Sequence, residues 1–290
     1  MFNRIGIVSN QTREGVNDTL AQTVEFLTRQ NIDVVVGESA AGMFSHPDVR
    51  FVPEEDVSKE RDLVIAIGGD GTMLRCGKAA FIDEVPILGI NLGRLGFLTD
   101  ISPRQLESAL EPILAGKFED DQRTVLNCEV VRDDNVVASS PGLNDVVIQK
   151  WNTARLITLD TSVDGRFVHS QRSDGMIVST PTGSTAYALS GGGPIVHPEL
   201  SVVVLVPICP HSLTNRPIIV GDDASIEVAV NTETSDQAHV TCDGETLAEL
   251  EPGDVIRICK HSQRLRLIHP AGHDHFATLR AKLHWGQAPC

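Results

Sequence analysis

Aromatic residues are scarce in this 290-residue chain, where they make up 4% of the sequence. A core with so few rings must be built mainly from Val, Ile, Leu and Ala, which suits β-sheets and sheet–helix layers better than an aromatic binding platform. Positive charge is also in short supply, since 24 Lys and Arg face 39 Asp and Glu and the net charge is −15. Proteins that bind nucleic acid or anionic membranes usually carry a basic patch, so this balance argues against both functions.

Cysteine pairs and long apolar runs are missing as well. The six cysteines include no CxxC pair, which is typical of reduced thiols in a cytosolic protein. The N-terminus lacks the apolar core and the cleavage site of a signal peptide. The longest apolar stretch, 202–210, is about half of the roughly 20 residues that a membrane span needs. We therefore expect a cytoplasmic protein without a membrane anchor.

The first part of the chain alternates short β-branched runs with segments of helix length. Strands are expected at 4–8, 33–36, 63–67 and 86–91, and helices at 17–31, 72–81 and 103–115. This alternation predicts an α/β N-terminal domain over residues 1–122, with a Rossmann-like parallel sheet covered on both faces. Length alone is also compatible with one large domain.

The period of the apolar residues changes from residue 125 onward. They now recur at every second position, between turn signals such as Asp164-Gly165 and Asp243-Gly244. This pattern predicts a second, mostly antiparallel β-sandwich domain over residues 123–275. The boundary between the two domains is expected at 119–122.

A glycine-rich turn follows the apolar strand at 63–67. It reads Gly68, Gly69, Asp70, Gly71 and Thr72, and a helix is expected to begin at or just after Thr72. Glycines let the backbone approach a ligand closely, and a helix N-terminus attracts phosphate. The sequence therefore predicts a phosphate-binding loop made of the three glycines and the threonine.

Asp70 is unusual in such a loop because a carboxylate repels phosphate. Two roles would explain it: holding Mg²⁺, or accepting a proton from a hydroxyl that attacks a phosphoryl group. A simpler alternative is an aspartate that caps the following helix. Glycines on both sides and the apolar strand before them favour a functional role. The P-loop pattern GxxxxGK[ST] and the dinucleotide pattern GxGxxG are both missing.

A second segment, 172–194, is rich in Ser, Thr and Gly and contains Tyr187, the only tyrosine of the chain. Hydroxyls and exposed backbone N–H groups can bind sugar hydroxyls, base edges or phosphates. A Ser/Thr-rich loop with a helix cap would explain single residues but explains the whole run poorly. The segment is therefore a second candidate binding site.

Together these motifs resemble the bacterial NAD kinases, the ATP-NAD kinase family. The similar segments are GGDGT at 68–72, NLGRLGFLT at 91–99, LNDVV at 143–147, SDGMIVSTPTGSTAYALSGGGPIVHP at 173–198 and PHSLxxRP at 210–217. The resemblance runs in order from Gly6 to about Trp285. GGDGT alone is shared with diacylglycerol and sphingosine kinases and, in a variant form, with phosphofructokinases, whereas STPTGSTAY is far more specific.

The resemblance implies a kinase that uses ATP and Mg²⁺ or another divalent cation. It would transfer the γ-phosphoryl group to the 2′-hydroxyl of the adenosine ribose of NAD and so make NADP. The family fold is similar to the one expected above, with a C-terminal segment of about 276–290 returning to the first domain. Relatives are commonly homodimers or homotetramers.

Site residues follow from the resemblance position by position. Asp70 would activate the ribose hydroxyl. The implied NAD-binding residues are Asp70, Gly71, Asn144, Asp145, Arg155, Arg172, Asp174, Thr185, Ala186, Tyr187, Ser190 and Glu245. Many relatives have Glu in place of Asp145, so the reach of this side chain is shorter here. No residue is assigned as a stable metal ligand.

The histidine-rich segment HPAGHDH contains His269, His273 and His275. The spacing of the first two matches the histidine half of a zinc finger, but no cysteine pair precedes them at the required interval. We therefore interpret all three as surface or packing residues.

Two alternative functions remain at the level of the sequence. One is a lipid kinase that shares GGDGT, against which the net charge and the lack of a basic amphipathic helix argue. The other is a non-catalytic NAD-binding regulator, against which the intact Asp70 argues.

Overall fold

The computed structural model describes residues 2–9, 15–42, 44–93, 95–151, 155–230, 238–251 and 253–286. The chain forms two compact units. Unit 1 comprises Met1–Gln122 and Leu265–Cys290, and unit 2 comprises Arg123–Arg264. Among the described residues, no helix has the length and apolar character needed to cross a bilayer.

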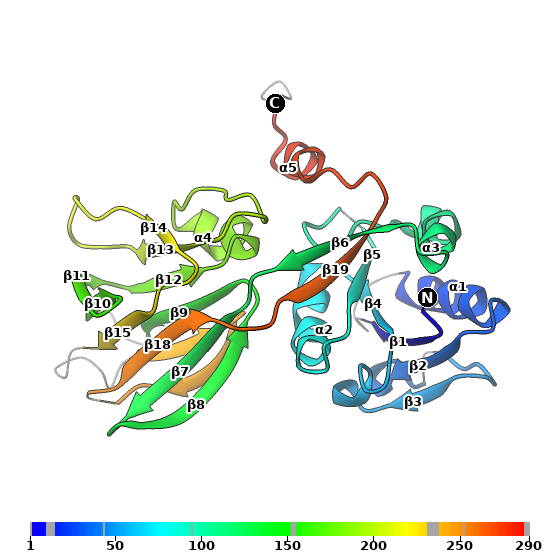
Figure 1. The fold of residues 1–290 in the computed structure, drawn as a ribbon, viewed down its shortest axis with the longest axis horizontal. Helices are drawn as coiled ribbons and strands as arrows, with labels where there is room; N and C mark the ends of the chain where they lie inside the picture. Colours follow the sequence, from blue (N-terminus) through cyan, green and yellow to red (C-terminus); the bar gives the residue numbers. More distant parts are fainter. Residues whose placement is uncertain are drawn as a thin grey trace. The chain divides into compact units, whose positions relative to one another are not determined.

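Unit 1 is built on a seven-stranded sheet with the order β3-β2-β1-β4-β5-β19-β6 (Figure 1). Its strands are β1 (Arg4–Ser9), β2 (Asp33–Gly37), β3 (Arg50–Val52), β4 (Leu63–Gly68), β5 (Ile87–Asn91), β6 (Phe118–Arg123) and β19 (Leu265–Pro270). The strands β1 to β5 pair in parallel, and β19 pairs in parallel with β5. Every residue of β4 is buried, as expected for a central strand of a covered parallel sheet. The predicted parallel sheet is confirmed.

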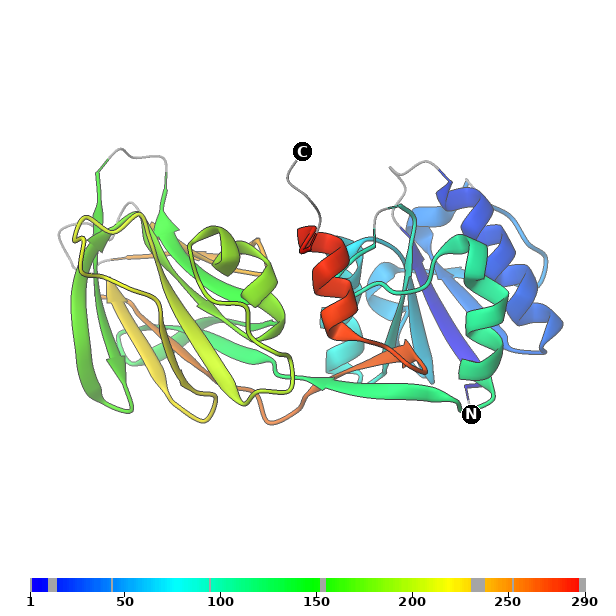
Figure 2. The same cartoon turned by 90° about the horizontal axis from the view of Figure 1, so that it is seen from above.

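Helices cover both faces of this sheet. They are α1 (Val16–Arg29), α2 (Asp70–Ile82), α3 (Leu106–Leu114) and α5 (His275–Leu283), with short 3₁₀ turns η1 (Glu38–Ala40), η2 (Glu54–Asp56) and η3 (Pro103–Gln105). Ile7 and Ile65 pack in one core with residues of α1 and α3, and Figure 2 shows these two helices on the same side of the sheet. Val8 and Val64, which neighbour Ile7 and Ile65 along the same strands, point the other way and face α2.

Two boundaries differ from the sequence-based expectation. The helix expected to begin at or after Thr72 begins at Asp70, because Gly69 is extended and serves as its N-cap. The return to unit 1, expected near residue 276, already begins with β19, where Leu267 pairs with Ile87. Alternating apolar residues mark β19 as a strand but cannot tell which sheet it joins.

Unit 2 consists of two six-stranded sheets with the orders β11-β10-β15-β18-β7-β8 and β14-β13-β12-β9-β16-β17. The strands are β7 (Leu126–Arg132), β8 (Asn135–Gly142), β9 (Asp145–Lys150), β10 (Ile157–Val163), β11 (Arg166–Ser173), β12 (Gly175–Ser179), β13 (Val202–Ile208), β14 (Ile218–Gly221), β15 (Ile226–Val230), β16 (Ala238–Cys242), β17 (Glu245–Glu249) and β18 (Val255–Lys260). Neighbouring strands in both sheets pair in antiparallel fashion. Inward residues such as Val130 on β7 and Ile148 on β9 share one core, which confirms the predicted β-sandwich.

Two short helical segments interrupt unit 2 between β12 and β13. They are η4 (Thr182–Thr185) and α4 (Tyr187–Ser190). Ala188 of α4 is buried against Ile177 of β12 and Val206 of β13. The Ser/Thr-rich run is therefore fixed to the surface of a sheet rather than extended as a free loop.

Candidate functional site

The glycine–aspartate turn lies where β4 passes into α2. Gly68 ends β4, Gly69 is the N-cap, and Asp70 and Gly71 begin the first turn of α2. Backbone N–H groups in the first turn of a helix have no partner further back in the helix, so they can bind phosphate. Gly71 is exposed, and a Cβ added to it would meet nothing within 4 Å. The turn thus has an open, donor-rich side.

Thr72 supports this turn from within the protein. Its side chain is buried, and a Cβ added to Gly68 would lie 2.2 Å from its Oγ1, so the turn requires glycine at position 68. Its backbone N–H donates to the Gly69 carbonyl at 2.9 Å. Contact between the Thr72 side chain and a phosphate, which the sequence predicts, would require this side chain to move.

The Asp70 carboxylate is held by backbone groups from another loop. Its Oδ2 accepts from the N–H of Phe97 and its Oδ1 from the N–H of Leu98, both at 3.0 Å. These residues follow β5, the strand beside β4, and the carboxyl ends of neighbouring parallel strands meet at one edge of a sheet. The interpretation of Asp70 as a helix cap is therefore wrong, because its side chain bonds to a different segment.

Gly96 completes this arrangement, a role that local sequence patterns do not predict. A Cβ at position 96 would lie 2.2 Å from Asp70 Oδ1 and 2.2 Å from Thr99 Oγ1, so any larger residue must displace one of them. Each carboxylate oxygen has about two lone pairs, so Asp70 retains acceptor capacity beyond its two N–H donors. The arrangement fixes a half-buried carboxylate that can still accept a hydroxyl proton.

In unit 2, the corner between β8 and β9 carries Asn144 and Asp145. The backbone N–H groups of Leu143, Asn144 and Asp145 all donate to the Asp243 carboxylate, at 2.9, 2.7 and 3.2 Å. Successive N–H groups that converge in this way form a concave anion-binding nest. The sequence predicted a turn at Asp243, and the structure adds that this turn fixes the backbone of Asn144.

The Ser/Thr-rich run holds the same corner from the other side. The Thr180 hydroxyl donates to the Leu143 carbonyl at 2.7 Å, and the Thr180 N–H donates to the Asn144 carbonyl at 2.9 Å. A Cβ at Gly183 would lie 2.1 Å from the Asn144 carbonyl oxygen, so this close approach requires glycine. The structure thus brings the two predicted NAD-binding segments of unit 2 together.

Within the run, the polar side chains divide into two groups. Ser184 is buried, and its hydroxyl donates to the Pro181 carbonyl at 2.6 Å, so it supports the fold. Tyr187 and Ser190 on α4 are exposed, and Thr185 and Ala186 are partly exposed. The predicted contact residues of this run are the ones that a ligand can reach.

Asp145 is buried, with 5% of its surface exposed. Burial and the negative charge of Asp243 raise the pKa of Asp145 to about 7. Near neutral pH this carboxyl group therefore exists in two forms. The protonated form can donate a hydrogen bond, whereas the ionised form can only accept.

This shift makes the stability of the protein depend on pH. In the unfolded chain Asp145 would titrate near pH 4, so between about pH 4 and pH 7 the folded state binds the extra proton, and stability falls as pH rises. One pKa unit corresponds to about 1.4 kcal/mol. We expect wild type to lose a few kcal/mol across this range relative to Asp145→Asn, measured by urea unfolding at several pH values. Equal pH slopes for the two proteins would contradict the assignment.

The remaining predicted residues of unit 2 lie apart from the Asn144 corner or at its margin. Asp174, between β11 and β12, forms an ion pair of 2.7 Å with Lys150, a residue that was not among the predicted site residues. Arg172 is exposed on β11, and its carbonyl accepts from the His211 N–H at 2.8 Å. Arg155 and Glu245 are exposed, with Glu245 beginning β17 directly after the Asp243-Gly244 turn.

The C-terminal histidines do not all fit the interpretation as surface or packing residues. His269 is buried, and the Nδ1 atoms of His269 and His273 both face the Asp100 carboxylate. Burial alone would raise the pKa of Asp100, but hydrogen bonds and charges from the two histidines outweigh it and hold this pKa well below its usual range. The two histidines and Asp100 therefore form a polar cluster.

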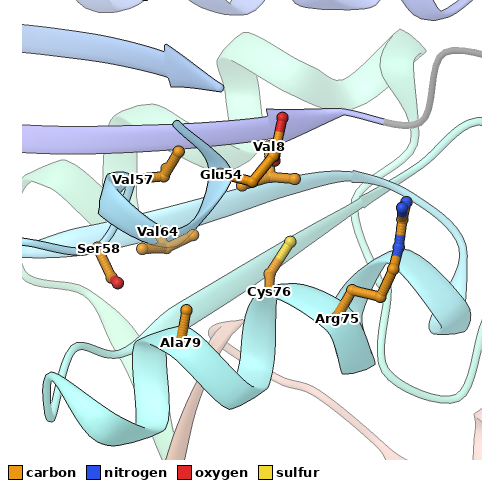
Figure 3. Close-up of a pocket in the computed structure, with 8 residues that line it drawn as sticks. All are labelled: Val8, Glu54, Val57, Ser58, Val64, Arg75, Cys76 and Ala79. Carbon is orange, nitrogen blue, oxygen red and sulfur yellow. The ribbon is translucent and has the colours of Figure 1, made fainter. Parts of the chain in front are cut away.

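Unit 1 also contains a small cavity of about 100 Å³ between α2 and the segment around η2 (Figure 3). It is lined by Val8, Glu54, Val57, Ser58, Val64, Arg75, Cys76 and Ala79. Burial raises the pKa of the Cys76 thiol to about 12, so this thiol stays neutral and unreactive. Sites for small molecules measure about 300–1,000 Å³, so this cavity is too small for a nucleotide.

Comparison with known proteins gives consistent matches along the chain. The sequence model of the ATP-NAD kinase N-terminal domain matches residues 5–118, and that of the ATP-NAD kinase C-terminal domain matches residues 143–270. The chain is 45% identical to the NAD kinase of Chromohalobacter salexigens, over 98% of this chain and 97% of that protein. It is 43% identical to the NAD kinase of Teredinibacter turnerae, again over 98% and 97%.

Solved structures agree with these matches. An NAD kinase from Archaeoglobus fulgidus in complex with ATP has a TM-score of 0.75 at 28% identity, and the alignment covers 96% of this chain and 99% of that one. The yeast NADH kinase complexed with NADH has a TM-score of 0.90 at 24% identity, over 99% of this chain and 89% of that one. At this level of identity, the yeast enzyme shows a shared fold.

Proposed function

Because the chain belongs to the ATP-NAD kinase family and is a kinase that converts NAD to NADP with ATP, we propose that Asp70 is the base of this reaction. The observation that supports this role is the position of its carboxylate. Two backbone N–H groups fix it beside an exposed glycine turn at a helix N-terminus. A base and a phosphate-binding turn are the two elements that transfer to a hydroxyl needs.

The nucleophile of the proposed step is the 2′-hydroxyl of the adenosine ribose, which is weak without a base. As the 2′-oxygen of the adenosine ribose bonds to the γ-phosphorus, its proton passes to the Asp70 carboxylate. The bond from the γ-phosphorus to the bridging oxygen breaks, and ADP leaves with the electron pair. Such general-base assistance is typically worth about 10²–10⁴-fold in rate. Gly69 and Gly71 would position the phosphates through backbone N–H groups.

A divalent cation would neutralise charge on the triphosphate. Mg²⁺ is commonly bound through one or two carboxylates together with substrate phosphates. Asp70 is the one carboxylate in the turn, and each of its oxygens already accepts a backbone N–H. Because these oxygens are already engaged, this donor set fits a cation that would arrive with ATP and be held mainly by its phosphates.

We assign the acceptor site to unit 2. Asn144 can donate and accept together, which suits an adenine edge or a ribose diol, and Asp145 lies beside it. Contacts with the adenine and its ribose would come from Thr185, Ala186, Tyr187 and Ser190. Contacts with the nicotinamide and phosphate end would come from Arg155, Arg172 and Asp174, and Glu245 would add a further polar contact.

This assignment gives Asp243 a positioning role that can be tested. Asn in its place keeps the turn, whose φ of 53° Asn tolerates, but removes the charge that three N–H groups share. Hydrogen bonds to charged groups contribute about 1.5–3 kcal/mol. We therefore expect Asp243→Asn to raise the KM for NAD about tenfold or more and to change the KM for ATP little, as Asn144→Ala should, in steady-state assays.

The matched control is Asp164→Asn. Asp164 also precedes a glycine in a hairpin turn with a φ of 51°, and its carboxylate also accepts a backbone N–H, from Ser225 at 2.9 Å. Asp164 lies between β10 and β11, in a different sheet from β9, which follows the Asn144 corner, so this variant should keep the wild-type KM for NAD. If both variants affect NAD equally, or if Asp243→Asn affects ATP instead, the positioning role is wrong.

The proposal also covers the localisation, the oligomeric state and the roles of the two domains. We place it in the cytoplasm, without a membrane or nucleic-acid partner, because its net charge is −15 and its six cysteines form no CxxC pattern. We also propose a homodimer or homotetramer, and light scattering after size-exclusion chromatography measures this directly. In functional terms, residues 1–122 would form the phosphoryl-transfer domain and the β-sandwich the NAD-binding domain.

A further inference from the structure

Three polar side chains converge in unit 1, away from the glycine–aspartate turn. This Asp100 cluster consists of Asp100, His269 and His273. Asp100 precedes Ile101, which bridges to Ile90 of β5, whereas His269 lies in β19 and His273 in the turn before α5. Their side chains are 13, 2 and 14% exposed, so the cluster is largely withdrawn from solvent.

The arrangement places three potential metal ligands together. The Nδ1 of His273 lies 3.2 Å from Asp100 Oδ2, and the Nδ1 of His269 lies against the same oxygen. One ligand atom from each residue lies within 4.8 Å of the other two. In a tetrahedral zinc site with bonds of about 2.0–2.2 Å, neighbouring ligand atoms are about 3.3–3.6 Å apart. Small side-chain movements would produce this spacing.

The cluster contains one buried oxygen, Asp100 Oδ1, without a hydrogen-bond partner among the described residues. Such an orphaned atom in a protein interior calls for an ion or an ordered water. The two imidazole rings also stack with centroids 4.0 Å apart, so one ion could contact a nitrogen of each ring. A divalent cation can balance the carboxylate while both rings stay neutral.

A carboxylate outside the cluster supports the same reading. The other ring nitrogen of His269, Nε2, lies 3.4 Å from Oδ2 of Asp121 in β6. Histidines that bind metals usually present their second nitrogen to a carboxylate or carbonyl, which fixes the ring and its tautomer. Asp121 is placed for this function, on the side of the ring opposite to Asp100.

We propose that Asp100, His269 and His273 bind one Zn²⁺ or a similar transition-metal ion, with Asp121 orienting His269. Two imidazoles and one carboxylate suit Zn²⁺, Co²⁺ or Ni²⁺, whereas Mg²⁺ prefers oxygen ligands alone. This site is therefore distinct from the cation that accompanies ATP. The ion fastens β19 and the turn before α5 to the segment that follows β5. Leu98, which holds Asp70, lies two residues before Asp100 in that segment.

Metal titration of the full-length protein tests the proposal. The protein is stripped with a chelator and titrated with Co²⁺, and then with Zn²⁺ in competition, without Mg²⁺ or ATP. We expect one equivalent of Co²⁺ with the visible absorption of a low-coordinate N/O site, displaced by one equivalent of Zn²⁺. Asp100→Asn and His273→Ala should abolish this binding, and Asp121→Asn should weaken it about 10–100-fold.

His275→Asn is the matched control, because His275 belongs to the same HPAGHDH segment but not to the cluster. It should bind metal as wild type does, and Zn²⁺ should raise the unfolding temperature of wild type and of this control but not of His273→Ala. The proposal is overturned if wild type binds no metal, whatever the folding of the variants. It is equally overturned if binding depends on His275 rather than on His273, which would indicate adventitious chelation by surface histidines.

Discussion

Asp70→Asn is expected to lower kcat by about 10²–10⁴-fold while the Kd for NAD changes little. The variant keeps the size and shape of the side chain but cannot accept the proton of the ribose hydroxyl. Residues assigned to NAD in unit 2 remain intact, so binding should survive. Steady-state kinetics and calorimetric titration with NAD measure the two quantities separately.

A structural side effect of this substitution has to be separated from the chemistry. The amide group of Asn would turn one NH₂ toward the N–H of Phe97 or Leu98, which both donate to Asp70 in the wild type. An unsatisfied donor of this kind costs about 1–3 kcal/mol, which urea unfolding would reveal. Asp18→Asn is the matched control, because Asp18 is likewise acidic and in the first turn of a helix of unit 1. Turnover of Asp70→Asn near the wild-type value would refute the role of Asp70.

Gly96→Ala is expected to reduce kcat about 100-fold, although it leaves Asp70 in the sequence. The added methyl group would lie 2.2 Å from Asp70 Oδ1, so the carboxylate must move away from its N–H donors. A displacement of about 1 Å at a reacting group can cost about 10²-fold in rate. Turnover at saturating ATP and NAD measures this effect without a contribution from weaker binding.

Gly93→Ala provides the control for Gly96→Ala. Position 93 lies in the same segment, and a Cβ there would meet nothing within 4 Å. This variant should retain wild-type turnover. If the two alanine variants are equally active, the carboxylate does not need the position seen here, and the proposed geometry is wrong.

Each unit contains a carboxylate that accepts hydrogen bonds from several backbone N–H groups, but the two carboxylates have different roles. Asp70 accepts two backbone N–H groups and stays half-buried beside an open turn, so its remaining lone pairs can act on a substrate. Asp243 accepts three backbone N–H groups and so fixes the backbone at 143–145. The same interaction thus places one carboxylate for chemistry and uses the other as a support.

Much of the fold follows from local patterns that a single sequence displays. Apolar runs such as β4 and the helical spacing of Leu20, Val24 and Leu27 in α1 predict a covered parallel sheet. In the second half of the chain the apolar residues recur at every second position, which predicts the β-sandwich. The predicted start of α2 was wrong because the N-cap is Gly69, which makes no side-chain cap hydrogen bond. A glycine N-cap is a weaker sequence signal than Ser, Thr, Asp or Asn.

The partners of the site residues could not be predicted in the same way. Asp70 meets Leu98 across 28 positions of sequence, and Asp243 meets Asn144 across 99. Such contacts depend on which strands become neighbours, and no local pattern encodes this. Gly96 lies against Asp70 because β4 and β5 are neighbours in the sheet, so its role depends on a strand pairing that no local pattern encodes. The lipid-kinase and regulator alternatives are wrong, because the matched relatives are NAD kinases over nearly their whole length.

The measurement that tests the central claim most directly is the product formed by the purified protein with ATP, Mg²⁺ and NAD. An NADP-specific dehydrogenase reports NADP, and phosphorus NMR locates the new phosphate on the ribose. We expect ADP and NADP in equal amounts, with the phosphate on the 2′-oxygen of the adenosine ribose, and almost no product from Asp70→Asn. Consumption of ATP without NADP, or undiminished NADP from Asp70→Asn, would contradict the account.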